Sequence, residues 1–197
     1  MPEAQIQASQ LSSLLYPLDE VYEDLRMPLP LVSLIDGHEM PEPYRSLLVH
    51  DTDMTSTLEA AYRQRIHLHV IKYRVRDNVL MRHVVLVLED DHTAVELGAI
   101  KIYLQRLPEQ VRALILEANI PLGTILREMN VVHESHPAAY FRIMADSLMA
   151  KELFVKGRAL LYGRRNVITG AAGETLAEVV EILPEATGLP GSEDGRG

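Results

Sequence analysis

The stretch Val79–Leu88, VLMRHVVLVL, is apolar on both faces, which is typical of a strand in the middle of a sheet. Two strand-like segments flank it. Residues 66–75 alternate apolar and polar side chains, and residues 94–104 are largely apolar. The turns between them, at residues 77–78 and 89–92, are short and polar. We therefore expect three antiparallel neighbours joined by tight turns.

Helical patterns surround this strand-rich section. Apolar residues recur at helical spacing over residues 1–26, 58–62, 111–118, 125–129 and 131–150. The short polar side chains of residues 51–55 are suited to cap the second of these helices. Residues 156–168 and Thr175–Leu183 are the last two expected strands. The whole pattern predicts an α+β fold, with an antiparallel sheet of about six strands covered by helices.

The chain of 197 residues is 47% hydrophobic, which favours one folded domain. We expect residues 1–43, rich in proline after the first helices, to wrap that domain. Residues 44–184 should form the domain itself. The Gly-, Ser- and Asp-containing tail, residues 185–197, is expected to be disordered.

Composition argues against several classes of function. The net charge is 19 − 28 = −9, which disfavours a general nucleic-acid or anionic-membrane partner but not a small anionic ligand. The chain has no cysteine, so disulfides, thiolate metal sites and cysteine nucleophiles are excluded. We see no signal peptide and no apolar run of membrane-spanning length. The sequence thus predicts a cytoplasmic protein.

Arg82 is the first candidate site residue, because a guanidinium on an apolar strand face is costly unless an anion pairs with it. It shares its face with Leu80, Val84, Leu86 and Leu88. A bidentate carboxylate is the natural partner for arginine. Two interpretations stay open at this stage: an ion pair with an internal Asp or Glu, or a site for a ligand carboxylate.

The last expected strand supplies a second candidate. Glu181 lies between Val179 and Leu183 on one face, and Glu178 lies on the other face. Such a carboxylate could hydrogen-bond a substrate hydroxyl or act as a general acid or base. The sequence leaves the choice of face open, and either glutamate could be an ordinary solvated sheet residue.

The corner Pro121-Leu122-Gly123 is the third candidate. Pro121 ends the helix that precedes it, and Gly123 stands where the next amphipathic run begins. Free backbone N–H groups and the positive end of the helix dipole at such a start suit a carboxylate. The ordinary interpretation is a simple helix–turn–helix corner.

Eight histidines raise the question of a metal site. His67 and His69 have the spacing of one strand face, and His133 and His136 have that of one helix face. The first pair is on a face that looks solvated, and Pro137 directly follows the second pair. We therefore expect no metal. The chain also has no Gly-rich phosphate loop and no nucleophile elbow.

These features resemble the chorismate pyruvate-lyase (4-hydroxybenzoate synthase) family over about residues 44–184. The resemblance rests on four segments in order: Leu47-Leu48-Val49-His50-Asp51-Thr52-Asp53-Met54-Thr55 with Leu58-Glu59; Met81-Arg82-His83-Val84-Val85-Leu86; Pro121-Leu122-Gly123; and Tyr162-Gly163-Arg164-Arg165 with Glu181-Ile182-Leu183-Pro184. The chain departs from the family pattern at Thr52, where the family usually has glycine, and over residues 131–140.

The resemblance implies a highly curved antiparallel sheet whose internal ligand cavity is covered by helical flaps. It also implies a lyase that removes pyruvate from chorismate, or from a related enolpyruvyl or cyclohexadiene carboxylate. Chorismate itself would yield 4-hydroxybenzoate, and no cofactor is needed. By position, Arg82 would bind the ring carboxylate with the backbone of Leu122 and Gly123. Glu181 would face the ring hydroxyl, and Arg165 would add a further substrate contact.

Two other functions compete with the lyase. The effector-binding domains of some transcriptional regulators resemble the same fold, so a non-catalytic sensor of aromatic carboxylates is one alternative. The lack of a basic helix-turn-helix segment ahead of the domain counts against it. The other alternative is a repurposed biosynthetic enzyme in which Glu181 works with His133 or His136.

Overall fold

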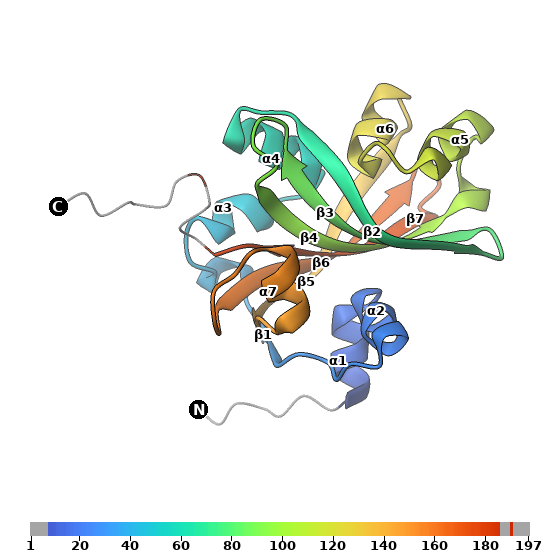
Figure 1. The fold of residues 1–197 in the computed structure, drawn as a ribbon. Helices are drawn as coiled ribbons and strands as arrows, with labels where there is room; N and C mark the ends of the chain where they lie inside the picture. Colours follow the sequence, from blue (N-terminus) through green and yellow to red (C-terminus); the bar gives the residue numbers. More distant parts are fainter. Residues whose placement is uncertain (1–7, 186–189, 191–197) are drawn as a thin grey trace.

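A single curved antiparallel sheet of seven strands forms the centre of the computed structural model, which describes residues 8–185 and 190 (Figure 1). The strands are β1 (Val32–Ile35), β2 (Ile66–Arg76), β3 (Val79–Leu88), β4 (Ala94–Tyr103), β5 (His133–Met144), β6 (Leu160–Gly170) and β7 (Thr175–Leu183). Their order across the sheet is β1-β5-β6-β7-β4-β3-β2. The last of the described strands along the chain, β7, thus lies in the middle of the sheet.

In the described part of the chain, seven α-helices pack around this sheet. They are α1 (Ala8–Leu15), α2 (Leu18–Leu25), α3 (Tyr44–Leu48), α4 (Met54–Tyr62), α5 (Glu109–Glu117), α6 (Leu122–Glu128) and α7 (Ser147–Glu152). Short 3-10 turns occupy Gly37–Glu39 and Leu104–Arg106. The predicted α+β class is confirmed. Apart from Glu185 and Pro190, the predicted disordered tail lies outside the described residues.

The predicted helix over residues 131–150 is wrong. Most of this segment is β5, which pairs with β1 on one side and β6 on the other. The fully buried Phe141 and Ile143 alternate along β5, as strand geometry requires. Pro137 is accommodated next to a bulge in the β5–β6 register. β1 and β5 are the two strands that the sequence analysis did not predict.

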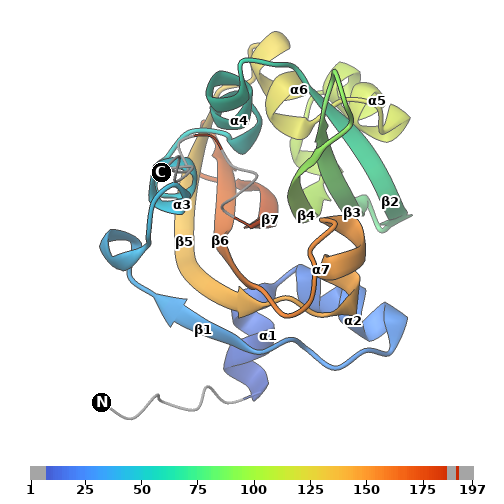
Figure 2. The same ribbon diagram turned by 60° about the vertical axis from the view of Figure 1, so that its left-hand side comes forward.

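The two faces of the sheet carry different helices (Figures 1 and 2). Helices α1, α2 and α7 cover one face, over a core that includes Phe141 and Val180. Helices α5 and α6 cover part of the other face, over a core that includes Val179. Helices α3 and α4 cover the rest of that second face, over a core that includes Leu183. The alternation of Val179 and Val180 shows how β7 contributes to both faces.

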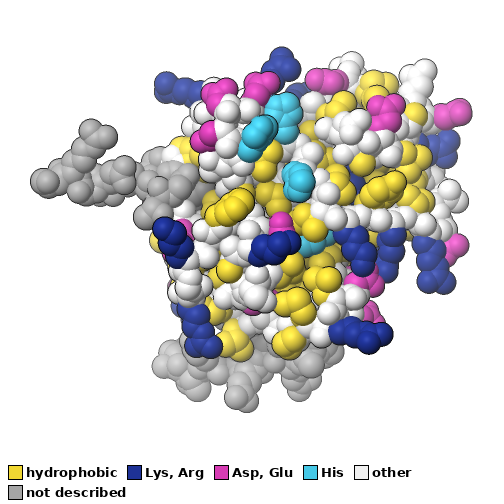
Figure 3. All heavy atoms as spheres, in the orientation of Figure 1, with side chains coloured by type: hydrophobic (Ala, Val, Ile, Leu, Met, Phe, Trp, Pro, Cys, Tyr) yellow, Lys and Arg dark blue, Asp and Glu magenta, His cyan; other side chains and the backbone are white. Residues whose placement is uncertain are grey.

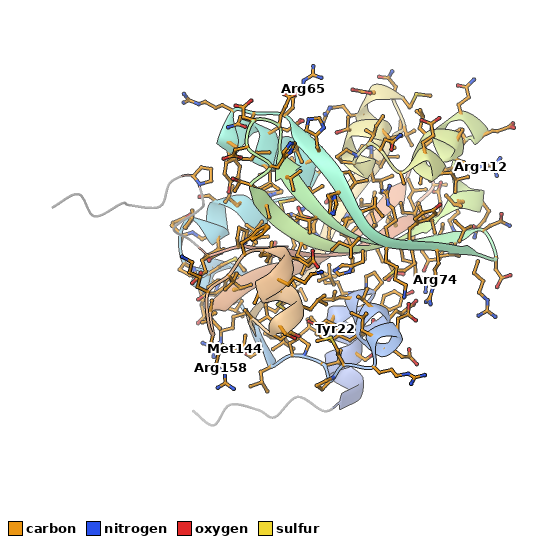
Figure 4. The ribbon with its side chains drawn as sticks, in the orientation of Figure 1. Tyr22, Arg65, Arg74, Arg112, Met144 and Arg158 are labelled. Carbon is orange, nitrogen blue, oxygen red and sulfur yellow. The ribbon has the colours of Figure 1, made fainter. Side chains whose placement is uncertain are left out.

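The N-terminal helices are part of the same core as the sheet. Leu15 and Leu18 are fully buried. The Tyr22 hydroxyl, between α2 and α7 in Figure 4, donates a hydrogen bond of 2.6 Å to Asp146. Arg74 of β2 reaches α2, where its Nη2 lies 2.8 Å from Glu20. The domain boundary after residue 43 stays a prediction.

The surface mixes both signs of charge. Lys, Arg, Asp and Glu side chains are interspersed over the face drawn in Figure 3. Within the described part of the chain, no helix is both long and apolar enough to cross a membrane.

Candidate functional site

A cavity of about 60 Å³ lies between the sheet and helices α4 and α6. Its walls are mainly aliphatic and include Leu68, Val84, Leu86 and Ile100. Polar side chains enter it from β3, β4, β6 and β7. Pockets for small organic ligands usually exceed about 300 Å³, so the cavity must enlarge to accept a molecule the size of an aromatic ring.

Arg82 enters this cavity from β3 and is only 1% exposed. Its Nε and Nη1 atoms have no hydrogen-bond partner among the described residues. Burial lowers the pKa of Arg82 to about 10, so the guanidinium still carries its charge at neutral pH. No internal carboxylate of the described chain pairs with it. Of the two interpretations left open by the sequence, the geometry favours a site for an external anion.

Glu181 also lines the cavity, where it forms a buried ion pair with Arg164 of β6. The two residues are 6% and 0% exposed. The remaining nitrogens of Arg164 donate to backbone carbonyls of the segment between α3 and α4, at His50 (2.9 Å), Leu48 (3.1 Å) and Thr52 (3.3 Å). Arg164 thus anchors this segment to the sheet and holds the Glu181 side chain in place.

Arg165, the predicted additional substrate contact, points to the opposite face of the sheet. Its Nη2 lies 2.9 Å from Glu178, and its Nε donates to the Tyr16 carbonyl at 3.3 Å. Glu178 also accepts a hydrogen bond of 2.7 Å from the Tyr103 hydroxyl. The prediction assigned the wrong member of the Arg164-Arg165 pair to the cavity side. The choice between the two glutamates is resolved in favour of Glu181.

Glu96 of β4 is a cavity residue that the sequence analysis missed. It is 4% exposed, and its Oε2 has no hydrogen-bond partner among the described residues. Burial, and secondly the charge of Glu181, raise the pKa of Glu96 well above its ordinary value of 4.5, although Arg164 opposes this. Burial therefore favours the neutral form of the Glu96 carboxyl group. The sequence could have indicated Glu96, because it is the one carboxylate in the largely apolar residues 94–104.

Asn166 of β6 is a second missed cavity residue. Its Nδ2 donates to Ser135 Oγ at 2.7 Å, whereas its Oδ1 has no partner in the described structure. Gly98 of β4 lines the cavity between these polar groups. A Cβ atom on Gly98 would lie 3.1 Å from Glu96 Oε1 and 3.2 Å from Val84 Cγ2. The glycine therefore leaves room for the Glu96 side chain.

The predicted corner forms as expected, and both Leu122 and Gly123 line the cavity. However, the carboxylate nearest to Gly123 belongs to the chain itself. A Cβ atom on Gly123 would lie 2.5 Å from Asp53 Oδ1, the oxygen that caps α4 by accepting from the Ser56 amide at 2.8 Å. The close approach of α4 and α6 therefore explains this glycine without a ligand.

The histidines that the sequence singled out lie outside the cavity. His133 Nδ1 is 2.8 Å from the Val131 carbonyl, and His136 Nε2 is 3.0 Å from Thr169 Oγ1. Both line a separate open groove beside the segment between α3 and α4. Neither histidine is placed to work directly with Glu181. The described residues include no cluster of three or more His, Asp or Glu side chains suited to a metal ion.

No family model matches this chain, and no curated protein matches it. Among solved structures, the effector domain of PhnF from Mycobacterium smegmatis is similar, with a TM-score of 0.51 and 13% identity over 68% of this chain and 88% of that one. A longer PhnF structure has a TM-score of 0.50 and 13% identity, over 67% of this chain. The match spans 63% of that longer protein.

A GntR-family transcriptional regulator from Enterococcus faecalis V583 is a further match, with a TM-score of 0.45 and 10% identity over 60% of this chain and 94% of that one. Identities this low concern the fold alone. The curved antiparallel sheet with covering helices fits the chorismate lyase-like fold, so the predicted fold class is confirmed.

Proposed function

We propose that this chain binds a small carboxylate in the cavity and acts as a ligand-sensing effector domain. The observation that supports this most directly is Arg82, a buried charged side chain whose Nε and Nη1 have no hydrogen-bond partner among the described residues. A ligand carboxylate would supply the missing charge and both missing acceptors. The similar fold of a protein described as an effector domain adds support.

Because the cavity is small, ligand binding would have to change the structure around it. A ring-sized ligand requires more than the present 60 Å³, so its binding must displace α4, α6 or both from the sheet. These helices are linked to each other by Arg127 of α6, whose nitrogens lie 3.8 Å from Asp53 and 3.5 Å from Glu59. Ligand binding would therefore move the two helices as a unit.

A chorismate lyase is the second candidate, because Arg82 and Glu181 line the same cavity as the family resemblance implies. The contact with Arg164 weighs against this reaction, because it occupies a Glu181 oxygen that would otherwise be available to the substrate. Absence of a nucleic-acid partner stays a prediction.

The test is isothermal titration of the purified chain with benzoate, 4-hydroxybenzoate and chorismate, together with an assay for released pyruvate. Binding without pyruvate release supports the sensor, whereas turnover supports the lyase. Arg82→Met should abolish binding. Arg76→Met on the neighbouring strand β2, where the side chain is 87% exposed, is the matched control and should bind normally. Normal binding by Arg82→Met would refute the site.

A further inference from the structure

The sheet ends in two edge strands of different chemistry, β2 on one side and β1 on the other. An edge strand leaves backbone N–H and C=O groups unpaired, so another strand can pair with it unless charges, bulges or covering elements prevent this. β2 has two of these protections. It contains Lys72, Arg74 and Arg76 but no acidic residue, and its register with β3 shifts between Val70 and Lys72. Pairing along β2 would have to remove water from three cations.

The other edge, β1, has neither charges nor a bulge. Residues 29–35, with the sequence LPLVSLI, carry no charge, and β1 pairs with β5 without a register shift. Figure 2 shows β1 at the rim of the sheet, and no described strand lies beyond it. Two leucines of this segment are well exposed, Leu31 by 80% and Leu34 by 59%. The β1 edge is therefore open and apolar, which favours pairing with another strand.

Backbone geometry determines which groups of β1 point outward. The Met144 amide donates to the Leu31 carbonyl at 2.9 Å, so the backbone groups of residue 31 face β5. Inward and outward backbone groups alternate along a strand of an antiparallel pair, so those of Val32 and Leu34 point away from the sheet. A second copy, related by a two-fold axis at Ser33, would place its Leu34 opposite Val32 and its Val32 opposite Leu34. All of these outward groups would then have partners.

The same register brings an exposed leucine to an open depression. With Ser33 opposite Ser33, Leu31 of each copy lies opposite Ile35 of the other copy. Ile35 lines a depression of about 460 Å³, together with Gly37 and Tyr140 among others. Side chains directly opposite each other in antiparallel strands lie on the same face and touch. Leu31 of one copy would therefore cover the depression on the other, and the contact would occur twice.

We propose that β1 is an interface between two copies of this chain, in which the two β1 strands pair antiparallel about Ser33 and join the two sheets. No like charges meet in this register, because the nearest charged residue, Asp36, lies opposite Pro30. β1 has only four residues, so backbone hydrogen bonds alone would hold the pair weakly, and the Leu31 contacts must contribute. The proposal is independent of the proposed function, because none of residues 31–35 lines the cavity.

Disulfide cross-linking tests the register. The chain contains no cysteine, so a single introduced cysteine can form a disulfide only with a second copy. Ser33→Cys should cross-link rapidly with copper phenanthroline as the oxidant, because opposite residues at such a position lie about 4.5 Å apart between Cα atoms. Leu34→Cys is the matched control on the same strand. Its Cα atoms would lie more than about 7 Å apart across the axis, so it should cross-link at least about tenfold more slowly.

Sedimentation equilibrium of the full chain, at about 1–100 μM, measures the association itself. The wild-type chain should reach twice the mass of one chain. Leu34→Lys should raise the Kd of the dimer by about tenfold or more, because it adds a charge to the apolar strand pair. Val75→Lys, which replaces a valine of β2 that is 47% exposed, is the control and should leave the Kd unchanged.

Circular dichroism checks that each variant is folded, and Leu31→Lys takes the place of Leu34→Lys if the latter is not. Three results would each overturn the proposal. One is a wild-type chain that stays monomeric at about 100 μM. Another is a dimer whose Kd the lysine on β1 does not change. The third is Ser33→Cys that cross-links no faster than Leu34→Cys.

Discussion

At the scale of the residue, the charge of Arg82 does not help to stabilise the fold without a ligand. Its surroundings, Leu80 and Val84 among them, would accept an apolar side chain of similar length. Natural binding sites often retain such groups at a cost in stability. The same side chain that makes ligand binding possible therefore makes the empty protein less stable.

Arg82→Met should raise the free energy of unfolding of the ligand-free chain by about 1–3 kcal/mol, because it removes an unpaired buried charge. Urea denaturation followed by circular dichroism measures this. Arg76→Met, in which the exposed arginine is lost, should change the stability by less than about 0.5 kcal/mol. A clear loss of stability in Arg82→Met would mean that the guanidinium contributes to the fold.

Glu96 should give the stability of the protein a distinctive dependence on pH. Its pKa is raised well above 4.5 in the folded state, so the folded state keeps a proton that the unfolded chain releases. Stability from this group is present below about pH 4.5 and is lost as the pH rises through the folded-state pKa. Glu96→Gln has no proton to release. Its melting temperature should exceed that of the wild type at about pH 8 and converge with it near pH 4.5.

The control for this pH profile is Glu23→Gln, which replaces an exposed glutamate of α2. It should follow the wild-type profile throughout. A constant difference in melting temperature between Glu96→Gln and the wild type, at every pH, would show that Glu96 does not titrate abnormally.

Single residues also show how far the sequence could predict the site. Arg82 stood out because its strand neighbours are apolar, whereas the sequence left the choice between Glu181 and Glu178 open and only the family resemblance favoured Glu181. Arg165 was assigned to the site in place of Arg164, because the buried face of β6 changes between Gly163 and Arg164. Glu96 was missed although it satisfies the criterion that identified Arg82. A charged residue within an apolar strand is a usable signal whenever the criterion is applied to every strand.

At the scale of the element, the contact between α4 and α6 forms the roof of the cavity. Asp53 caps α4, and its side chain occupies the space where Gly123 of α6 lacks a Cβ atom. Asp53 thus caps α4 and also limits which side chain can stand at position 123 of α6. The contact determines how closely the two helices cover the sheet.

Gly123→Ala should destabilise the chain by about 1–3 kcal/mol, since the added methyl group would lie 2.5 Å from Asp53 Oδ1. Elsewhere in a helix, the same change usually stabilises by about 1 kcal/mol. A double-mutant cycle with Asp53→Ala isolates the contact, because the alanine should cost less in that background. Thr124→Ala, one position further along α6, should be nearly neutral. Additive effects of Gly123→Ala and Asp53→Ala would rule out the contact.

Elements with strong periodicity were predicted well, including β2, β3, β4 and both helices around the Pro-Leu-Gly corner. β5 was mistaken for a helix because Tyr140, Phe141 and Met144 also fit helical spacing. Its pairing with β1 and β6 depends on segments about 100 and 20 residues away, which local patterns do not contain.

At the scale of the whole molecule, helices α4 and α6 lie on one face of the sheet and the N-terminal helices α1 and α2 on the other (Figure 1). The cavity, which α4 and α6 cover, therefore lies on the face away from α1 and α2. The sheet therefore separates the binding site from the core that α1 and α2 complete. Residues 44–184 alone would lack these helices and the edge strand β1.

A chain of residues 44–184 should not unfold cooperatively, because it exposes the apolar surface that Leu15, Leu18 and Tyr22 cover in the full chain. Heat-induced unfolding and binding of a hydrophobic dye, compared with a chain that starts at residue 8, test this. A sharp transition and normal ligand binding in the shorter chain would establish the boundary after residue 43 that the sequence suggested.

The central place of β7 has a consequence for how the protein is made. β7 joins β4 to β6, yet of the seven described strands it is the last to leave the ribosome. Until then, β2–β4 and the β5–β6 pair have no partner across the middle of the sheet, and the cavity lacks Glu181. The growing chain must therefore keep two incomplete sheets apart from each other and from other chains until β7 emerges. Synthesis that stops before Thr175 leaves two open edges instead of a binding site.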